Sequence, residues 1–361
     1  MRQAPTPRRR LPRIFYPRAP HGDGFENTGD GLGKIPRRCA GGFQDAGKSF
    51  YNAPVRTIAV INQKGGVGKT TSVANLGAAV AADGHDICLI DLDPQSHLTL
   101  HLGIDEGSIK SSAYDLLTNK APIVSTIVPV APHLWVVPSV IDLAAAEVEL
   151  AATVGREQIL RDCLAEADLP FELAMIDCPP SLGLLTLNAL AAADDVIIPL
   201  QPHFLALHGL GKLLETVSLV QRRINPRLRV SGVILCMYES GTRLASEVTE
   251  NLRAFFSAAR GSAAPWSQAR IYETVIRRNI KLAECPSHGK TIFDYEPHSR
   301  GAEDYRGLAR EFLASLGLST PPGDESISQP AGGETPPPAT AVAAVAAPSA
   351  IDAPTPPQPQ P

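Results

Sequence analysis

Two lysines and two threonines in a glycine-rich stretch are the first residues whose types and spacing indicate chemistry. Residues 63–71 read Gln-Lys-Gly-Gly-Val-Gly-Lys-Thr-Thr and follow a short apolar run at 57–61. Glycines let backbone N–H groups close around phosphate oxygens, and a helix that begins there adds its positive dipole end. Lys69 can then reach the β- and γ-phosphates, and the Thr70 hydroxyl can ligate Mg²⁺. The predicted ATP-binding loop consists of Lys64, Gly65, Gly66, Val67, Gly68, Lys69, Thr70 and Thr71.

The loop departs from the common pattern G-x-x-x-x-G-K-[ST] at its first glycine. Gln63 stands at that position, and a second lysine, Lys64, follows it. Two lysines would place additional positive charge beside the phosphates. The plainer interpretation is that Lys64 is an ordinary solvated loop lysine. The order of strand, loop, Lys-Thr and helix nevertheless favours nucleotide binding.

Three aspartates are predicted to lie at strand ends beside this loop. Asp91 and Asp93 follow one buried apolar run, and Asp177 follows another. Ligands of open α/β sheets bind at the carboxyl ends of the strands, so these carboxylates are expected to face the nucleotide. Asp177 has the position of a Walker B aspartate that holds Mg²⁺, in part through water. The alternatives are a polar turn for Asp91 and Asp93 and a helix cap for Asp177, and the proline pair after Asp177 argues against the cap.

The rest of the chain alternates apolar, strand-like runs with segments of helical periodicity. Further strands are expected at 134–138, 195–202, 229–238 and 271–274, and helices at 72–81, 112–117, 142–152, 156–167, 207–223, 245–258 and 301–316. The strand runs are apolar through their centres, which is typical of parallel strands covered on both faces. The predicted fold class is therefore α/β: a doubly wound, mostly parallel sheet in a single P-loop NTPase domain with disordered tails.

Composition separates this domain from two terminal segments. Residues 1–54 carry ten Lys and Arg against four acids and are rich in Pro and Gly, so a disordered basic arm is expected. Residues 319–361 contain twelve prolines and no Lys or Arg, so a disordered tail is expected. The domain at 55–318 is mildly acidic once both ends are subtracted from the net charge of −4. Any contact with nucleic acid must therefore come from a local basic patch.

Cysteine usage and hydropathy limit the cellular setting. Six cysteines are scattered singly, without a Cys-x-x-Cys pair. This pattern argues against a disulfide framework, a zinc site or an iron–sulfur cluster, and it fits a reducing cytoplasm. No apolar segment follows the arginines at 8–10, and no run approaches the ~20 apolar residues of a membrane span. We therefore expect a cytoplasmic protein without membrane contact.

Several separate stretches together resemble the ParA/Soj family of chromosome- and plasmid-partitioning ATPases, within the MinD-like group that has a deviant Walker A loop. The resemblance covers residues 55–316 and rests on residues 63–71, 90–95, 176–181, 199–202, 237–243, 273–289 and 299–305. It implies an ATPase that uses ATP and Mg²⁺. It also implies weak hydrolysis that a ParB-like centromere-binding partner stimulates.

The resemblance implies an ATP-dependent homodimer that sandwiches two nucleotides. Lys64 would be the signature lysine that reaches the partner's nucleotide, and Lys69 would be the lysine of its own site. Gly65 would sit at the crowded dimer interface, where any Cβ should clash. Such a dimer is a switch more than a metabolic enzyme, because the γ-phosphate holds loops that hydrolysis releases.

The same resemblance assigns the acidic residues. Asp93 would position the attacking water and so join Lys64 and Lys69 as a catalytic residue. Asp91 would lie in a switch region near Mg²⁺. The metal set is then Thr70, Asp91 and Asp177, in part through water.

ATP-bound dimers of this family bind DNA without sequence preference, and three basic residues match that contact. These are Arg243, Arg278 and Lys281. A few Arg and Lys suffice for salt-sensitive, non-specific binding. They would otherwise be solvated loop charges, and the basic arm would add to the contact or be a solvated tail. This resemblance implies association with the nucleoid.

The late loop that contains Arg278 and Asn279 packs near the adenine in relatives, so both are expected among the ATP-binding residues. The family usually has proline before this Arg-Asn pair, whereas this chain has Arg277. Two interpretations stay open: altered base contacts, or stronger DNA binding through the extra arginine.

Other functions of this group lack their sequence features here. A MinD-like ATPase that positions a membrane or protein-cluster cargo is the nearest alternative, but its membrane form needs a C-terminal amphipathic helix. A nitrogenase-reductase-like enzyme needs paired or bridging cysteines. A ligase of the dethiobiotin type shares the P-loop without the late segments, and an inactive scaffold would not need both lysines, Thr70, Asp93 and Asp177. The cargo is open: a chromosome, a plasmid or a protein cluster.

Overall fold

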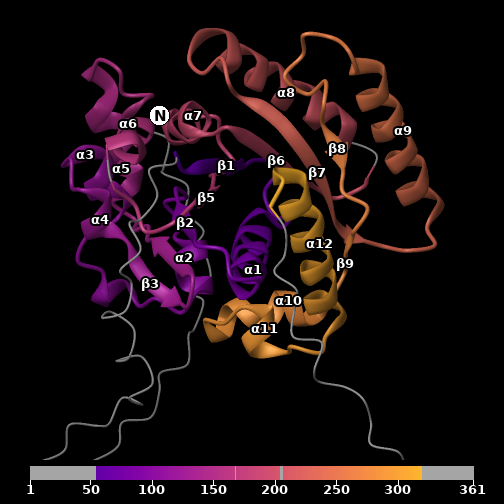
Figure 1. The fold of residues 1–361 in the computed structure, drawn as a ribbon, viewed down its shortest axis with the longest axis horizontal. Helices are drawn as coiled ribbons and strands as arrows, with labels where there is room; N and C mark the ends of the chain where they lie inside the picture. Colours follow the sequence, from indigo (N-terminus) through magenta and orange to yellow (C-terminus); the bar gives the residue numbers. More distant parts are fainter. Residues whose placement is uncertain (1–53, 167, 204–205, 319–361) are drawn as a thin grey trace, which may run out of the picture. The chain divides into compact units, whose positions relative to one another are not determined.

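A nine-stranded, mostly parallel sheet runs through residues 54–166, 168–203 and 206–318, the part of the chain that this computed structural model describes (Figure 1). The strand order is β3-β4-β2-β5-β1-β6-β7-β8, with β9 paired to β7. All pairs are parallel except β3 with β4. The strands are β1 Arg56–Val60, β2 Ile87–Asp91, β3 Val128–Ala131, β4 Leu134–Val137, β5 Leu173–Asp177, β6 Asp195–Leu200, β7 Arg229–Tyr238, β8 Arg270–Ile271 and β9 Ile276–Arg277.

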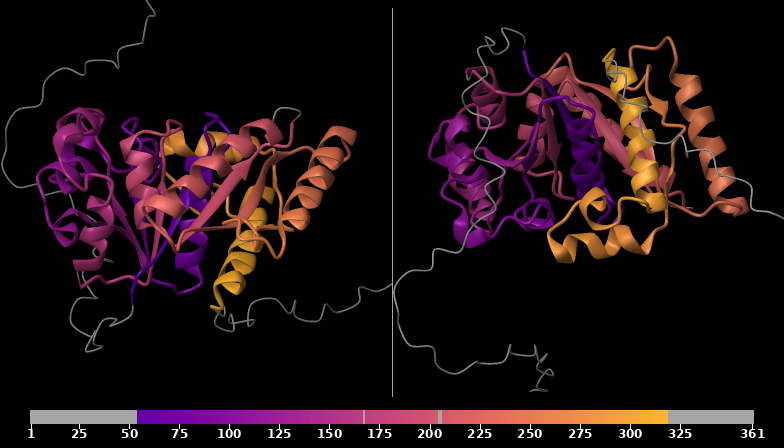
Figure 2. Two further views of the ribbon diagram at one scale, coloured as in Figure 1. Left: turned by 90° about the horizontal axis from the view of Figure 1, so that it is seen from above. Right: turned by 60° about the horizontal axis from the view of Figure 1, so that its bottom comes forward.

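Helices cover both faces of this sheet (Figures 1 and 2). One layer contains α1 Lys69–Ala82, α2 His97–His101, α10 Ile280–Glu284, α11 Ile292–Tyr295 and α12 Arg300–Leu316. The other contains α3 Ala113–Thr118, α4 Ile123–Thr126, α5 Leu143–Glu149, α6 Ile159–Glu166, α7 Leu184–Ala192, α8 Ala206–Arg223 and α9 Arg243–Ala259. In the described residues, 3₁₀ turns lie at Glu106–Ser108, Leu150–Ala152 and Cys285–His288.

Strand side chains explain why the sheet needs both layers. In β1, Ile58 and Val60 pack in one core cluster, and Ala59 packs in the other. All three are at most 1% exposed, because successive side chains of a strand point to opposite faces. Strands without a polar face are stable only when helices cover both sides. This arrangement confirms the predicted doubly wound α/β fold.

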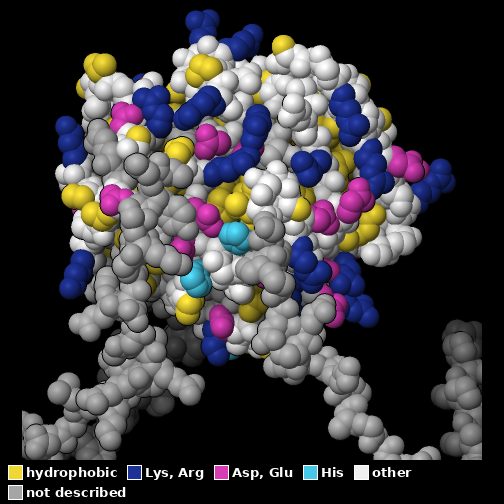
Figure 3. Space-filling model, viewed as in Figure 1, with side chains coloured by type: hydrophobic (Ala, Val, Ile, Leu, Met, Phe, Trp, Pro, Cys, Tyr) yellow, Lys and Arg dark blue, Asp and Glu magenta, His cyan; other side chains and the backbone are white. Residues whose placement is uncertain are grey.

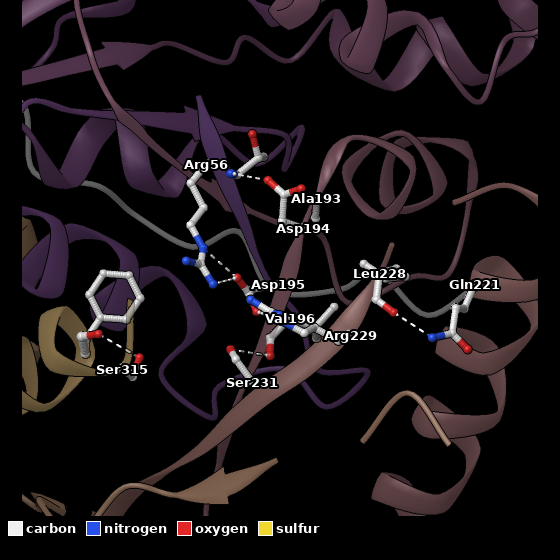
Figure 4. A network of polar contacts seen from close by, with 12 residues as sticks. Arg56, Ala193, Asp194, Asp195, Val196, Gln221, Leu228, Arg229, Ser231 and Ser315 are labelled. Carbon is white, nitrogen blue, oxygen red and sulfur yellow. Dashed lines mark hydrogen bonds and ion pairs between the residues drawn. The ribbon is translucent and has the colours of Figure 1, made fainter. Parts of the chain in front are cut away.

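Charged residues join three strands at the amino-terminal edge of the sheet, opposite the carboxyl ends of the strands (Figure 4). Asp195 is 1% exposed and accepts hydrogen bonds from Arg56 Nε at 2.9 Å and Arg229 Nε at 2.8 Å. The neighbouring Asp194 carboxylate accepts from the Thr57 backbone at 3.0 Å. A buried charge that both arginines share joins β1, β6 and β7 at this edge.

The predicted element boundaries differ from the structure where long-range contacts decide them. The helix expected at 156–167 begins at Ile159, because Asn188 of α7 accepts a hydrogen bond from the Leu160 backbone there. The strand expected at 271–274 is wrong in its bounds: two short strands, β8 and β9, flank residues 272–275, which are in no strand. The antiparallel β3 was not predicted. The arm and tail expectations fall outside the described residues.

Candidate active site

The glycine-rich loop joins β1 to α1 and takes the backbone conformation that its glycines allow. Gly66 and Gly68 have φ values of +71° and +92°, and Gly68 caps the start of α1. The left-handed region strongly favours glycine, since a Cβ there approaches the following carbonyl. Asn62 braces the loop: its amide donates to the Pro199 carbonyl of β6 at 2.7 Å, and its Oδ1 accepts from the Lys64 backbone at 3.0 Å.

The two loop lysines have opposite environments. Lys69 is 7% exposed, and burial lowers the pKa of its ammonium while the charges of Asp177 and Asp93 partly offset this. Lys64 is exposed at the tip of the loop, and its Nζ lies 2.7 Å from His203 Nε2. A Cβ added to the adjacent Gly65 would meet no atom within 4 Å in the described chain. The outer part of the loop is therefore open to solvent.

Thr70 and Asp177 form the polar centre of the site. The Thr70 hydroxyl donates to Asp177 Oδ2 at 2.7 Å, and the Oδ1 atom of the same buried carboxylate has no hydrogen-bond partner among the described residues. Burial and the charge of the adjacent Asp91 raise the pKa of Asp177 well above its usual range. A buried, unpartnered carboxylate oxygen beside a threonine hydroxyl fits a hard divalent cation such as Mg²⁺. The loop and the β5 end thus have the donor set that an Mg–nucleotide requires.

Asp91 lies beside Asp177 in the sheet register, but both of its carboxylate oxygens already accept hydrogen bonds from neighbouring residues. Oδ1 accepts from the Asp93 backbone at 3.1 Å, and Oδ2 accepts from both the backbone and the hydroxyl of Thr99, at 2.9 and 2.7 Å. Burial is the main cause that raises the pKa of Asp91, to about 7. In this structure Asp91 therefore organises the turn after β2.

Asp93 is held in that turn by one contact to its backbone and one to its side chain. Its carbonyl accepts from the Ser139 hydroxyl at 2.8 Å, and its Oδ1 accepts from the Gln95 backbone at 3.0 Å. Ser139 in turn donates its backbone N–H to the Thr99 hydroxyl at 2.9 Å. The segments after β2 and β4 are therefore linked directly behind the predicted water-positioning residue.

The late loop and the start of α9 follow the carboxyl ends of β9 and β7, the same edge of the sheet as the P-loop. Arg278 pairs with Glu239 at 3.1 Å, Lys281 with Glu284 at 2.9 Å and Arg243 with Glu247 at 2.7 Å. Asn279 is the cap of α10, because its Oδ1 accepts from the Lys281 backbone at 2.8 Å. No hydrogen bond or ion pair of the described residues joins Arg278 or Asn279 to the P-loop.

Three contributing residues were not predicted from the sequence. Asn62 and Ser139 each lie two residues after the end of a strand, a position that could have marked them as strand-end polar residues. Thr99 lies inside the short helix α2, and its role depends on contacts with Asp91 and Ser139 that no local pattern shows.

Comparison with known proteins identifies the family. Residues 55–230 match the family described as AAA domain. The chain is 44% identical over 261 residues to the sporulation initiation inhibitor protein Soj of Bacillus subtilis, across 72% of this chain and 99% of that protein. The chain belongs to the ParA/Soj family of chromosome-partitioning ATPases.

Other ParA/Soj relatives match at similar levels. The chromosome partitioning protein ParA of Caulobacter vibrioides is 42% identical over 264 residues, across 72% of this chain and 95% of that protein. The chromosome-partitioning ATPase Soj of Thermus thermophilus is 43% identical over 267 residues, across 74% and 99%. This ParA/Soj chain is thus an ATPase of the partitioning type.

Solved structures share the ParA/Soj fold. Cobyrinic acid a,c-diamide synthase of Mycobacterium smegmatis, with bound ATP analogue and magnesium, has a TM-score of 0.60 and 36% identity, across 74% of this chain and 99% of that one. The septum site-determining protein MinD of Pyrococcus horikoshii, complexed with Mg-ADP, has a TM-score of 0.56 and 22% identity, across 73% and 98%, and shows the fold alone. Across the ParA/Soj residues that the structure describes, no helix combines the length and apolar character needed to cross a bilayer.

Proposed function

We propose that this ParA/Soj-family ATPase is an ATP-controlled switch for partitioning. With ATP and Mg²⁺ it forms a homodimer that binds DNA without sequence preference, and slow hydrolysis, stimulated by a ParB-like centromere-binding protein, returns it to the monomer. Its place would be the nucleoid in the cytoplasm, with a chromosome or plasmid as cargo. The observation that carries the proposal is the contrast between the two loop lysines: Lys69 is buried beside the carboxylates of its own site, and Lys64 is exposed beside the open Gly65.

Each residue of the site has a part in this proposal. The backbone N–H groups of residues 65–71 and the Lys69 ammonium would hold the phosphates of ATP. Thr70 and Asp177 would hold Mg²⁺, which when bound supplies charge neutralisation at the phosphates. Asp93 would orient the attacking water, and Lys64 of the second copy would neutralise charge on the transferred phosphoryl group.

The turn after β2 is the element that ATP would bias. Asp91 and Thr99 fix it from one side, and Ser139 fixes the Asp93 backbone from the other. A γ-phosphate that contacts such a turn stabilises one arrangement, and hydrolysis removes that contact. Asp91 would act on Mg²⁺ indirectly, by holding the turn beside Asp177.

DNA would meet the edge of the sheet where β7 and β9 end. Arg243 and Arg278 have side chains that are 93% and 75% exposed, and both follow these strand ends. Their ion pairs with Glu247 and Glu239 are surface pairs, which are weak and can exchange for phosphate. Acidic side chains also lie between basic ones on the face shown in Figure 3. A single protomer would therefore bind DNA weakly, and a dimer with two such edges would bind it more strongly.

Gel retardation of non-specific duplex DNA tests the proposal. The wild-type protein is compared in Mg-ATP and in Mg-ADP, and Lys64→Ala is compared in Mg-ATP. Retention by the wild type in ATP alone supports the ATP-gated dimer. Equal retention in all lanes would mean that charge in residues 1–54 binds DNA irrespective of nucleotide.

Absence of retention in every lane would contradict the DNA-binding switch and favour the MinD-like alternative, an ATPase that positions a membrane or protein-cluster cargo. Sedimentation of the protein with anionic lipid vesicles in ATP then separates the membrane form of that alternative from the protein-cluster form.

A further inference from the structure

A small pocket lies beside the P-loop, between the end of β6 and the start of α8. Its lining includes the polar residues Asn62, Lys64, Gln201 and His203 and apolar residues such as Val67 and Leu210. Among these described lining residues, the side chains that can carry charge are those of Lys64 and His203. The pocket therefore brings the exposed loop lysine next to a titratable ring on another segment.

The contact between these two residues has a defined polarity. Lys64 Nζ lies 2.7 Å from His203 Nε2. An ammonium can only donate, so Nε2 must be the acceptor and the ring proton must be on Nδ1. Burial, and then the positive charge of Lys64, lower the pKa of His203 below its ordinary value. The ring is therefore neutral near pH 7 and suited to accept this hydrogen bond.

The backbone on both sides of the contact is tied together independently of it. Asn62 joins the P-loop to the Pro199 carbonyl of β6 and also caps the Lys64 backbone N–H. Breaking the Lys64–His203 hydrogen bond therefore need not move either main chain. The Lys64 side chain can swing away while its loop stays in place.

We propose that His203 is a positioning residue that holds the Lys64 ammonium against its own protomer until a second copy of this chain binds. The inference rests on the proposed function, because the dimer requires Lys64 to reach the partner's nucleotide. One ammonium cannot be in the His203 pocket and at the partner's phosphates together. The hydrogen bond therefore opposes dimer formation.

Loss of the Lys64–His203 hydrogen bond in both protomers multiplies its effect on the dimer dissociation constant. One such exposed hydrogen bond shifts an equilibrium by roughly threefold to tenfold. Because a symmetric dimer releases two of them, His203 raises the dimer dissociation constant by about ten- to a hundredfold. Nucleotide affinity of the monomer does not change, because the phosphates meet the Lys69 side of the loop.

Sedimentation velocity of the full chain in Mg-ATP measures this dissociation constant. His203→Ala should dimerise at a roughly ten- to a hundredfold lower protein concentration than the wild type. His203→Gln keeps an acceptor near the Nε2 position and should restore the wild-type value. His208→Ala is the matched control, an exposed histidine on α8. Equal constants for wild type and His203→Ala, or equal constants for His203→Ala and His203→Gln, would overturn the inference.

A second measurement separates this inference from the proposed function. The His203 ring is titrated by NMR in Mg-ADP, where no dimer is needed. Lys64→Met should raise the pKa of the ring toward 6.5, because the neighbouring charge and the donor are removed. An unchanged titration would refute the Lys64–His203 contact even if the wild type dimerises. A shifted titration in a protein that never dimerises would support the Lys64–His203 contact and contradict the proposed ATP-dependent dimer.

Discussion

The guanidinium of Arg277 is paired with the carboxylate of Asp304, with a nitrogen–oxygen distance of 2.6 Å. The Arg277 backbone N–H also donates to Asp304, at 2.9 Å. Two turns further along α12, Glu311 accepts hydrogen bonds from the backbone of Glu273 and Thr274. One face of α12 therefore holds the segment that precedes Arg278, at residues 273, 274 and 277. The same helix packs beside α1, where the Tyr305 hydroxyl lies 3.3 Å from Ser72 Oγ.

Asp304→Asn should loosen the late loop without unfolding the domain. The substitution removes the charge that the Arg277 side chain and backbone share, and such a loss costs about 1–2 kcal/mol of unfolding free energy for a partly exposed pair. Urea denaturation measures that loss, and hydrogen exchange should show faster exchange at residues 276–281. Glu303→Gln is the control, since Glu303 is 63% exposed and 3.6 Å from Arg277. Unchanged exchange at 276–281 would show that Asp304 does not hold the loop.

This pair also shows what the sequence could and could not predict. The P-loop and the strand-end aspartates were predictable because one strand, one turn and one helix start suffice to place them. The role of Arg277 was not, because its partner lies 27 residues later on α12. The guanidinium is engaged by Asp304, and this favours neither an altered base contact nor a stronger DNA contact. The short helices α10 and α11 were missed for a related reason, since segments of four or five residues are helical only through packing.

Asp177→Asn should stabilise the nucleotide-free protein at high pH. A carboxyl group with a raised pKa binds more protons in the folded than in the unfolded chain, so the free energy of unfolding falls as pH rises above about 4. Asparagine can still accept the Thr70 hydrogen bond but never becomes charged. In chelator, the stability of the wild type relative to that of the variant should therefore fall as pH rises above about 4, so that the variant is the more stable protein at pH 8.

Denaturant titrations at several pH values, together with Mg-ATP binding, check this expectation. The same variant should lose Mg²⁺-dependent ATP binding, because the proposed metal ligand is neutral. Asp105→Asn, at an exposed residue before the 3₁₀ turn Glu106–Ser108, should leave both stability and binding unchanged. Equal pH dependence of stability in the wild type and in Asp177→Asn would contradict the raised pKa of Asp177.

Gly65→Ala and Gly68→Ala should separate dimerisation from nucleotide binding. Gly68 has a φ of +92°, so an alanine there costs about 1–2 kcal/mol and distorts the phosphate cradle. A Cβ at Gly65 meets nothing within 4 Å in the described chain. The free energy of unfolding of this variant should therefore lie within about 0.5 kcal/mol of the wild-type value, and the variant should bind ATP normally. Its ATP-dependent dimer should be lost if the partner copy crowds this position. Equilibrium nucleotide titration and sedimentation in Mg-ATP give the two readouts, and a Gly65→Ala dimer of wild-type affinity would place the interface elsewhere.

Arg243→Ala and Glu247→Gln should change DNA binding in opposite directions. Arg243 is the first residue of α9, and its ion pair with Glu247 competes with phosphate for the guanidinium. Each phosphate contact contributes about 0.9 to the slope of log affinity against log salt, so removing Arg243 from both copies of a dimer should lower that slope by about two.

Glu247→Gln removes the carboxylate that competes with phosphate and should raise the affinity for DNA in Mg-ATP, with unchanged ATPase activity as its control. Titration of duplex DNA at several salt concentrations measures both effects, and a salt slope that Arg243→Ala leaves unchanged would remove this residue from the DNA contact. If Arg278→Ala lowers the salt slope and Arg243→Ala does not, the DNA contact is confined to the late loop. Glu239, which pairs with Arg278, is then the carboxylate that competes with phosphate.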